Sequence, residues 1–188
     1  MGPGSPTLLI LDLDETLVHA TEEPLGRAHD FVVGPYFVYR RPHLAEFLYS
    51  CSACFRLAVW STATDEYVRP VVERIMPPGI EPEFAWGRSR CVRGYDHEAF
   101  EEEFIKDLKK VKRAGYRLER VLIADDTPRK VRRHYGNAVY VPPFLGDPED
   151  GTLPRLAGYL MSLRDVANVR TLEKRGWSIQ ARRIEDGR

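Results

Sequence analysis

The stretch that most constrains this chain is a short apolar run that ends in two aspartates. Residues 8–11 are Leu-Leu-Ile-Leu, and Asp12 and Asp14 follow at once. Such a run, without polar alternation, is typical of a strand buried on both faces of a parallel sheet. Acids at positions i and i+2 of an extended chain point to the same side, so their charges repel unless a cation or a shared proton offsets them. An ordinary solvated turn is the alternative interpretation, because Asp-x-Asp alone recurs by chance.

Two later segments repeat the pattern of an apolar run followed by polar residues. Residues 121–124 are Val-Leu-Ile-Ala and precede Asp125 and Asp126, while residues 55–60 precede Ser61. Shorter β-prone runs lie at residues 83–86 and 138–141, and a weak pair around residues 31–39 predicts a small β-hairpin insertion. Helical spacing of apolar residues separates these runs. The sequence therefore predicts an α/β fold with a doubly wound parallel sheet. The segments expected to be helical begin at residues 40–42, after Thr64, at His97, at Pro128 and at Leu153.

The segment from His97 to Ala114 leaves the position of a lysine open. Phe100, Phe104, Leu108 and Val111 form the apolar stripe of the expected helix, and Lys106 lies off that stripe. Either Lys106 faces solvent, or the segment breaks near Phe104 and a new helix starts with Lys106-Asp107-Leu108.

Composition points to one ordinary globular domain. The chain has 188 residues, and its 28 Lys plus Arg balance its 28 Asp plus Glu. This neutral balance gives no support to bulk-charge binding of nucleic acid or membranes, and no apolar run is long enough to span a bilayer. We expect a soluble intracellular protein, cytoplasmic or nuclear, with no membrane partner and a preference for the monomer. Residues 1–6 look like an expression remnant, and residues 166–188 form a charged tail, partly loose or used in a contact, with Trp177 as its strong anchor.

The three cysteines do not complete a recognisable site. Cys51 and Cys54 form a Cys-x-x-Cys pair, which is typical of a redox pair or of half a zinc site. A structural zinc site needs four ligands, and Cys91 with scattered histidines is all that could complete one. We expect packed, reduced thiols.

Residues at the carboxyl ends of parallel strands should meet in one crevice. Carboxylates gathered there would repel a phosphate, but they suit Mg²⁺, which takes one or two carboxylates and keeps waters and phosphate oxygens. A lysine is then needed to neutralise the remaining charge, and Lys106 is a candidate. This combination suits phosphoryl transfer, where positioning and charge neutralisation do most of the work. The residues expected to meet are Asp12, Asp14, Ser61, Asp125 and Asp126.

At this point the chain resembles a known family. Residues 12–19, Asp-Leu-Asp-Glu-Thr-Leu-Val-His, resemble the signature of the haloacid dehalogenase (HAD) superfamily. Within it, the chain is similar to the small C-terminal-domain phosphatases, whose domain is called FCP1-homology or NLI-interacting-factor-like. The resemblance covers about Thr7 to Leu163. Further matches lie at residues 41–48, 60–71, 106–108 and 121–128.

The resemblance implies a role for each matching residue. Asp12 is the expected nucleophile, and Asp14 is the expected acid/base, which also offers its backbone carbonyl to Mg²⁺. Asp126 is a further metal ligand, and Asp125 beside it orients water or the lysine. The expected metal set is thus Asp12, Asp14, Asp125 and Asp126. The transferred phosphate is expected to contact Ser61, Thr62, Lys106 and Arg88, with Thr16 steadying the loop and Lys109 or Lys110 as substitutes for Lys106.

These roles predict a HAD-like phosphatase domain over residues 7–165. We expect a Mg²⁺-dependent enzyme that forms an aspartyl-phosphate and acts on phosphoserine or phosphothreonine in proteins. The insertion after the opening motif is short and no large cap domain is expected, so an open crevice favours a phosphorylated protein or peptide. Two alternatives stay open: a phosphatase for nucleic-acid ends or small phosphoesters, because fold does not decide substrate, and a non-catalytic binding module of the same fold.

Overall fold

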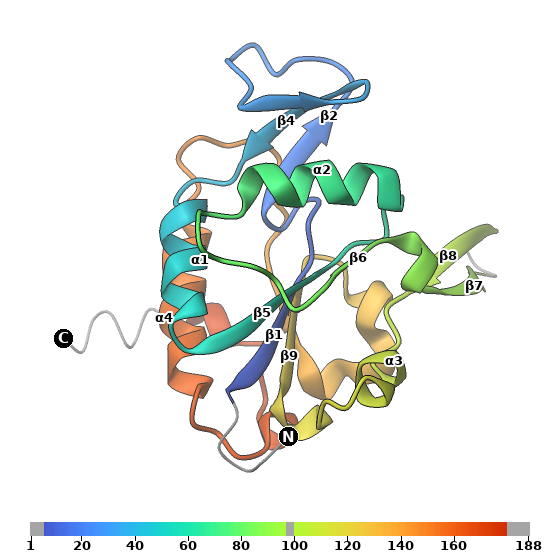
Figure 1. Cartoon of the computed structure of the whole chain (residues 1–188), viewed down its shortest axis with the longest axis vertical. Helices are drawn as coiled ribbons and strands as arrows, with labels where there is room; N and C mark the ends of the chain where they lie inside the picture. Colours follow the sequence, from blue (N-terminus) through green and yellow to red (C-terminus); the bar gives the residue numbers. More distant parts are fainter. Residues whose placement is uncertain (1–5, 97–99, 180–188) are drawn as a thin grey trace.

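A parallel sheet forms the centre of the computed structural model, which describes residues 6–96 and 100–179. Its strand order is β10-β9-β1-β5-β6, with all neighbours parallel (Figure 1). This arrangement confirms the predicted α/β fold with a doubly wound parallel sheet. Residues 1–5 of the expected remnant, the predicted helix start at His97 and the end of the tail (180–188) lie outside the described residues. The strands are β1 (Thr7–Leu11), β5 (Phe55–Trp60), β6 (Ala85–Trp86), β9 (Val121–Asp125) and β10 (Ala138–Tyr140).

Helices cover both faces of the sheet because successive side chains of β1 point to opposite faces. Leu9 and Leu11 pack into one core, and Leu8 and Ile10 pack into a second core on the other face. All four side chains are buried, which explains why β1 is continuously apolar. Figure 1 shows α1 beside α4 on one face and α3 on the other. The helices are α1 (Leu44–Ser52), α2 (Asp65–Ile75), α3 (Lys109–Arg113) and α4 (Thr152–Leu163).

The insertion between β1 and β5 is a small antiparallel sheet of order β2-β4-β3. The expected hairpin is formed by β3 (Phe31–Val33) and β4 (Tyr36–Arg40), and β2 (Val18–Thr21) adds a third strand. Its base is held by Arg41, which is 1 % exposed. The Arg41 guanidinium donates to both carboxylate oxygens of Asp150 at 2.9 Å and to the carbonyl of Thr16 at 3.0 Å. This contact ties the insertion to the loop that carries the first two aspartates.

The helix predicted from His97 to Ala114 was wrong over Glu101–Ile105, which forms a strand. That region forms an antiparallel hairpin of β7 (Val92–Asp96) and β8 (Glu101–Ile105). The glutamates of β8, which suited the first turn of a helix, pair instead with arginines of β7 and of the segment after β9. Phe100, expected in the apolar stripe, is 80 % exposed. The pairs are Arg93–Glu102, Arg129–Glu101 and Arg132–Glu103.

The chain therefore breaks before Lys106, as the second interpretation of this segment held. The helix that follows, α3, begins at Lys109, three positions later than that interpretation placed it. Lys106 does not face solvent: it is fully buried in the loop between β8 and α3. The helix expected after Asp126 is a 3₁₀ segment, η3 (Pro128–Asn137), with a kink at His134. Shorter 3₁₀ segments are η1 (Arg88–Arg90), η2 (Leu118–Arg120) and η4 (Val169–Thr171).

The described part of the charged tail packs on the edge strand β10. Trp177 is 2 % exposed, and its indole Nε1 donates a 2.6 Å hydrogen bond to the carbonyl of Tyr140. Its ring also lies 5.8 Å from that of Tyr159 on α4. Within the described residues, no helix has the length and apolar character needed to cross a membrane.

Candidate active site

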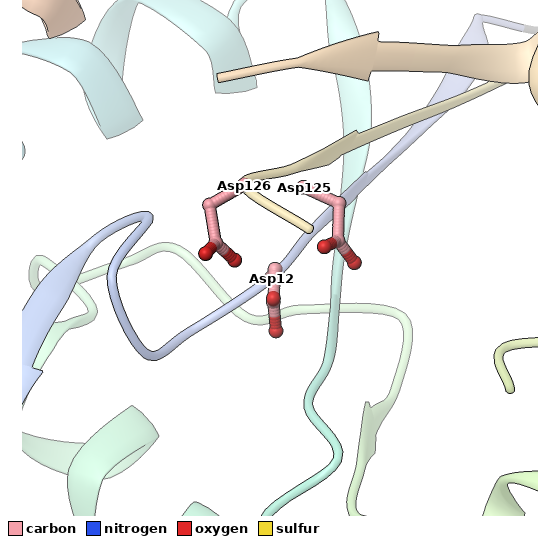
Figure 2. A group of neighbouring side chains, drawn as sticks. All are labelled: Asp12, Asp125 and Asp126. Atoms are coloured by element: carbon pink, nitrogen blue, oxygen red, sulfur yellow. The ribbon is translucent and has the colours of Figure 1, made fainter. Parts of the chain in front are cut away.

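The ends of β1 and β9 bring three aspartates together. Leu11 is in register with Ala124, and the N–H of Asp12 donates to the carbonyl of Ala124 at 2.9 Å. Asp12 and Asp125 therefore leave neighbouring strands side by side. Each of Asp12, Asp125 and Asp126 offers a carboxylate oxygen within 4.8 Å of the other two, and Figure 2 shows these carboxylates converging. Within residues 6–96 and 100–179 this is the one group of three or more carboxylate, imidazole or thiolate ligands.

A buried lysine neutralises part of this charge. Lys106 Nζ lies 2.7 Å from Asp12 Oδ1 and 2.6 Å from Asp125 Oδ2. Burial alone would lower the pKa of Lys106, but the two carboxylates outweigh burial and raise it. The neighbouring Asp107 holds the loop in place, since its carboxylate accepts hydrogen bonds from Arg133 at 3.0 Å and pairs with His134 at 2.8 Å. Lys109 is exposed and therefore does not substitute for Lys106.

Asp14 faces a different environment from Asp12. Its Oδ1 accepts a 2.7 Å hydrogen bond from the Tyr67 hydroxyl, and its Oδ2 accepts one of 3.0 Å from the Ser61 hydroxyl. Ser61 lies at the end of β5, and Tyr67 lies on the first turns of α2. The Asp14 carboxyl is thus not part of the three-carboxylate group, so a metal contact by Asp14 would have to use its backbone carbonyl.

The pKa values of the two aspartates diverge in consequence. Burial alone would raise the pKa of Asp12, but the ammonium groups of Lys106 and Lys130 outweigh it and hold the pKa below its ordinary value. Burial and the nearby charge on Asp12 raise the pKa of Asp14, and the hydrogen bonds from Tyr67 and Ser61 offset this only in part. The surroundings therefore shift the two pKa values in opposite directions, down for Asp12 and up for Asp14.

A cleft of about 280 Å³ opens beside Asp14, between the insertion and α2. Arg88, one of the predicted phosphate contacts, lines it, and its Nε donates to the carbonyl of Thr62 at 2.8 Å. The Thr62 backbone thus positions Arg88. A larger hollow of about 630 Å³ lies against another side of α2 and contains none of the predicted site residues. The cleft is lined by Asp14, Glu15, Ala20, Tyr36, Ala63, Thr64, Tyr67 and Arg88.

Thr16 contributes to the loop through its backbone carbonyl rather than through its hydroxyl. Its carbonyl accepts the hydrogen bond from Arg41. Its hydroxyl is buried, and no hydrogen-bond partner for it lies within the part of the chain that the structure describes. The backbone of residue 16, rather than its side chain, therefore makes the visible contact.

Comparison with known protein families identifies the family of this chain. The family described as NLI interacting factor-like phosphatase matches residues 7–170. The chain belongs to this family. The predicted resemblance to the FCP1-like branch of the HAD superfamily is thereby confirmed.

Relatives of this NLI interacting factor-like domain are longer proteins. The human carboxy-terminal domain RNA polymerase II polypeptide A small phosphatase 1 is 30% identical over 169 residues, which cover 86% of this chain and 60% of that protein. The fission yeast nuclear envelope morphology protein 1 is 27% identical over 176 residues, which cover 87% of this chain and 34% of that protein. The chain thus spans between about a third and three fifths of these two relatives.

Solved structures agree with the fold. The structure of Fcp1, an essential RNA polymerase II CTD phosphatase, superposes with a TM-score of 0.63 at 18% identity, covering 96% of this chain and 64% of that one. A likeness at this identity supports the arrangement of strands and helices, and the site is argued from the residues of this chain.

Two further residues near the aspartates, Lys130 and Tyr67, had no role predicted from the sequence. Lys130 Nζ lies 3.2 Å from Asp12 Oδ2 and 3.5 Å from Asp126 Oδ1. Its spacing of four from Asp126 is the signal that could have indicated the second contact. Tyr67 lies in the segment expected to be helical after Thr64, and its hydroxyl donates to Asp14. In both cases the side chain contacts an aspartate that follows β1, although its own residue lies on another element.

Cys51 and Cys54 lie apart from this site, whereas the buried Cys91 thiol donates to the carbonyl of Ser61 at 3.8 Å. Cys51 and Cys54 are both free thiols, and Cys51 is buried on α1. Burial and the neighbouring Cys54 raise the pKa of Cys51 to about 12. A thiol with so high a pKa is a poor nucleophile and a poor metal ligand at neutral pH.

Proposed function

We propose that this chain is a Mg²⁺-dependent phosphatase that forms an aspartyl-phosphate on Asp12 and acts on phosphoserine or phosphothreonine in proteins. The observation that carries the proposal is the divergence of Asp12 and Asp14. Two carboxyl groups whose surroundings separate their pKa values are the arrangement that nucleophile and general acid require. Asp12 is the ionised partner, and Asp14 is the partner that holds a proton.

The reaction follows from these protonation states. A carboxylate oxygen of Asp12 attacks phosphorus, the bond from phosphorus to the serine or threonine oxygen breaks, and Asp14 gives that oxygen its proton. In the second half, water attacks the aspartyl-phosphate while the Asp14 carboxylate takes a proton from that water. Inorganic phosphate leaves, and both carboxyl groups return to their first state.

The donor set fits Mg²⁺. Carboxylate oxygens are hard ligands, and three of them within 4.8 Å can share one small cation. Asp12 and Asp126 would hold the ion, with Asp125 beside them and the backbone carbonyl of Asp14 as a further ligand. When bound, Mg²⁺ supplies neutralisation of charge on the transferred phosphate.

Other side chains around the cluster are suited to hold the phosphate. Ser61 has its hydroxyl directed at Asp14, so a phosphate beside Asp14 would lie within its reach. Lys106 fixes Asp12 and neutralises charge, while Arg88 lines the cleft beside Asp14 and donates to the carbonyl of Thr62. Their contribution is to orient the phosphate so that phosphorus faces Asp12.

A protein segment is the favoured substrate. In the described residues the insertion between β1 and α1 is the small sheet of β2, β3 and β4, and the cleft beside Asp14 is about 280 Å³. Such a cleft takes a phosphorylated side chain and its neighbours more readily than it encloses a free metabolite. Several relatives are named as phosphatases of the RNA polymerase II C-terminal domain or of CTD type, which supports the same class.

The test is hydrolysis of an aryl phosphate, with and without Mg²⁺, by the native chain and by Asp12→Asn. We expect Mg²⁺-dependent hydrolysis that falls by at least about a thousandfold in the variant, the scale seen when the nucleophile of a catalytic unit is removed. Equal rates in the two proteins would contradict the mechanism, and absence of hydrolysis in both would favour a binding module. Phosphopeptides, 3′-phosphorylated oligonucleotides and sugar phosphates, assayed side by side, then test the substrate class.

A further inference from the structure

Each carboxylate oxygen of Asp12 faces a different ammonium group. Oδ1 lies 2.7 Å from Lys106, and Oδ2 lies 3.2 Å from Lys130. Lys106 also bonds Asp125, whereas Lys130 also faces Asp126 Oδ1 at 3.5 Å. The Lys130 ammonium therefore lies between Asp12 and Asp126, the two carboxylates that the proposed function assigns to Mg²⁺.

The two lysines are held with different firmness. The Lys106 contacts of 2.6 and 2.7 Å are short, as expected of charge-assisted hydrogen bonds, and its side chain is 0% exposed. The Lys130 contacts are longer, and its side chain is 21% exposed. Lys106 is thus an enclosed part of the site, while Lys130 reaches in from the surface and has a route out.

A divalent ion and the Lys130 ammonium cannot share this position. Two cations a few ångströms apart repel strongly at the low effective dielectric of a partly buried site. Asp12 is itself fully buried, and the Lys130 ammonium lies 3.2 Å from its Oδ2. Either cation offsets the repulsion between Asp12 and Asp126, but not both at once.

We propose that Lys130 is a built-in counter-ion of Asp12 and Asp126 that a divalent ion must displace. Lys130 then weakens the affinity of the site for Mg²⁺ and holds the acidic cluster together before the metal binds. The proposal rests on the proposed function for the identity of the cation. It adds a residue that sets how much Mg²⁺ the protein needs.

The test is the affinity of the full chain for Mg²⁺, measured by calorimetric titration after chelator treatment, with bound Mn²⁺ counted by electron paramagnetic resonance. Lys130→Gln keeps much of the side-chain length and removes the charge. We expect it to bind Mg²⁺ about tenfold more tightly, because the metal no longer displaces an ammonium. Lys112→Gln, at an exposed position of α3, removes the same charge and should leave the affinity within about twofold.

Two further readouts separate charge from packing. Lys130→Arg keeps the charge and should retain the weak affinity of the native chain. Lys130→Gln should melt at a lower temperature than the native chain without metal, and saturating Mg²⁺ should remove that difference. Unchanged or weaker Mg²⁺ affinity in Lys130→Gln, tighter binding in Lys130→Arg, or no Mn²⁺ bound by any variant would each overturn the proposal.

These outcomes are independent of the proposed activity. If the native chain hydrolyses no phosphate ester but Lys130→Gln binds Mg²⁺ more tightly, the counter-ion proposal stands and the proposed function fails. If the native chain is an active phosphatase and the affinities of the two proteins are equal, the reverse holds.

Discussion

The two acidic pairs of this chain look like copies in the sequence and differ in the structure. Asp12 and Asp14 follow β1, while Asp125 is the last residue of its neighbour β9 and Asp126 follows it. Of the first pair, Asp12 lies among the lysine ammonium groups, and Asp14 turns to the hydroxyls of Ser61 and Tyr67. Both members of the second pair stay on the cationic side, Asp125 with Lys106 and Asp126 with Lys130.

This contrast shows that partners, rather than position on a strand end, decide what a carboxyl group can do. Separation by one residue lets the loop after β1 place its two acids in unlike surroundings, which lower the pKa of Asp12 and raise that of Asp14. The adjacent Asp125 and Asp126 each face a lysine ammonium group, which suits charge balance and metal binding. The first pair can therefore divide two chemical tasks, and the second can only support them.

The largest expected effect comes from removing the proton donor of the first pair. Asp14→Asn should slow the single-turnover reaction of a phosphoserine peptide by about a thousandfold, because its leaving oxygen needs a proton. A nitrophenyl phosphate needs no proton to leave, so the variant should still release a burst of nitrophenol before turnover stalls. Rapid-quench and stopped-flow measurements compare the two first steps. An equal loss of rate in both would show that Asp14 is not the acid.

In the second pair, the fully buried Asp125 should contribute most to stability. Asp125→Asn leaves the enclosed Lys106 with one carboxylate instead of two, which should cost about 2 kcal/mol of unfolding free energy. Urea unfolding of the native chain and the variant at the same pH measures this. Asp165→Asn, at an exposed position, should change the unfolding free energy by less than about 0.5 kcal/mol. A similar loss in both variants would remove the structural role assigned to Asp125.

The other member of the second pair should affect the metal and not the leaving group. Asp126→Asn should lower the rates on the phosphopeptide and on the aryl phosphate by the same factor, about tenfold at low Mg²⁺. Excess Mg²⁺ should restore both rates. Titrating Mg²⁺ in steady-state assays of both substrates checks this, and a leaving-group preference like that of Asp14→Asn would erase the distinction between the pairs.

Much of this arrangement was predictable from the sequence because it depends on strand ends. The apolar runs before Asp12, Ser61 and Asp125 indicated buried parallel strands, and parallel strands bring such residues to one edge. The same runs predicted the central parallel sheet, with helical segments between its strands. A strand can be predicted from local sequence alone where one continuous apolar run specifies it.

The sequence was less informative where distant residues decide the structure. The glutamates of β8 form a hairpin because arginines from two other segments pair with them, and local spacing alone suggested a helix. Lys130 contacts Asp12 across 118 positions of the chain. Its spacing from Asp126 was visible, but nothing local indicated that it also covers the other strand end.

The smallest expected effect concerns the difference between the pKa values of Asp12 and Asp14. The Tyr67 hydroxyl donates to Asp14 at 2.7 Å, which stabilises the charged form and lowers the pKa that burial raises. Tyr67→Phe should therefore raise the pKa of Asp14 further, and the alkaline fall of the phosphopeptide rate should move to higher pH by up to about one unit, the worth of one hydrogen bond to a charged group. Profiles of kcat/KM against pH measure the shift. Tyr36→Phe is the matched control, since Tyr36 lines the same cleft and its ring packs 5.7 Å from that of Tyr67. A shift to lower pH in Tyr67→Phe, or an equal shift in both variants, would mean that the hydroxyl of Tyr67 does not tune the proton donor.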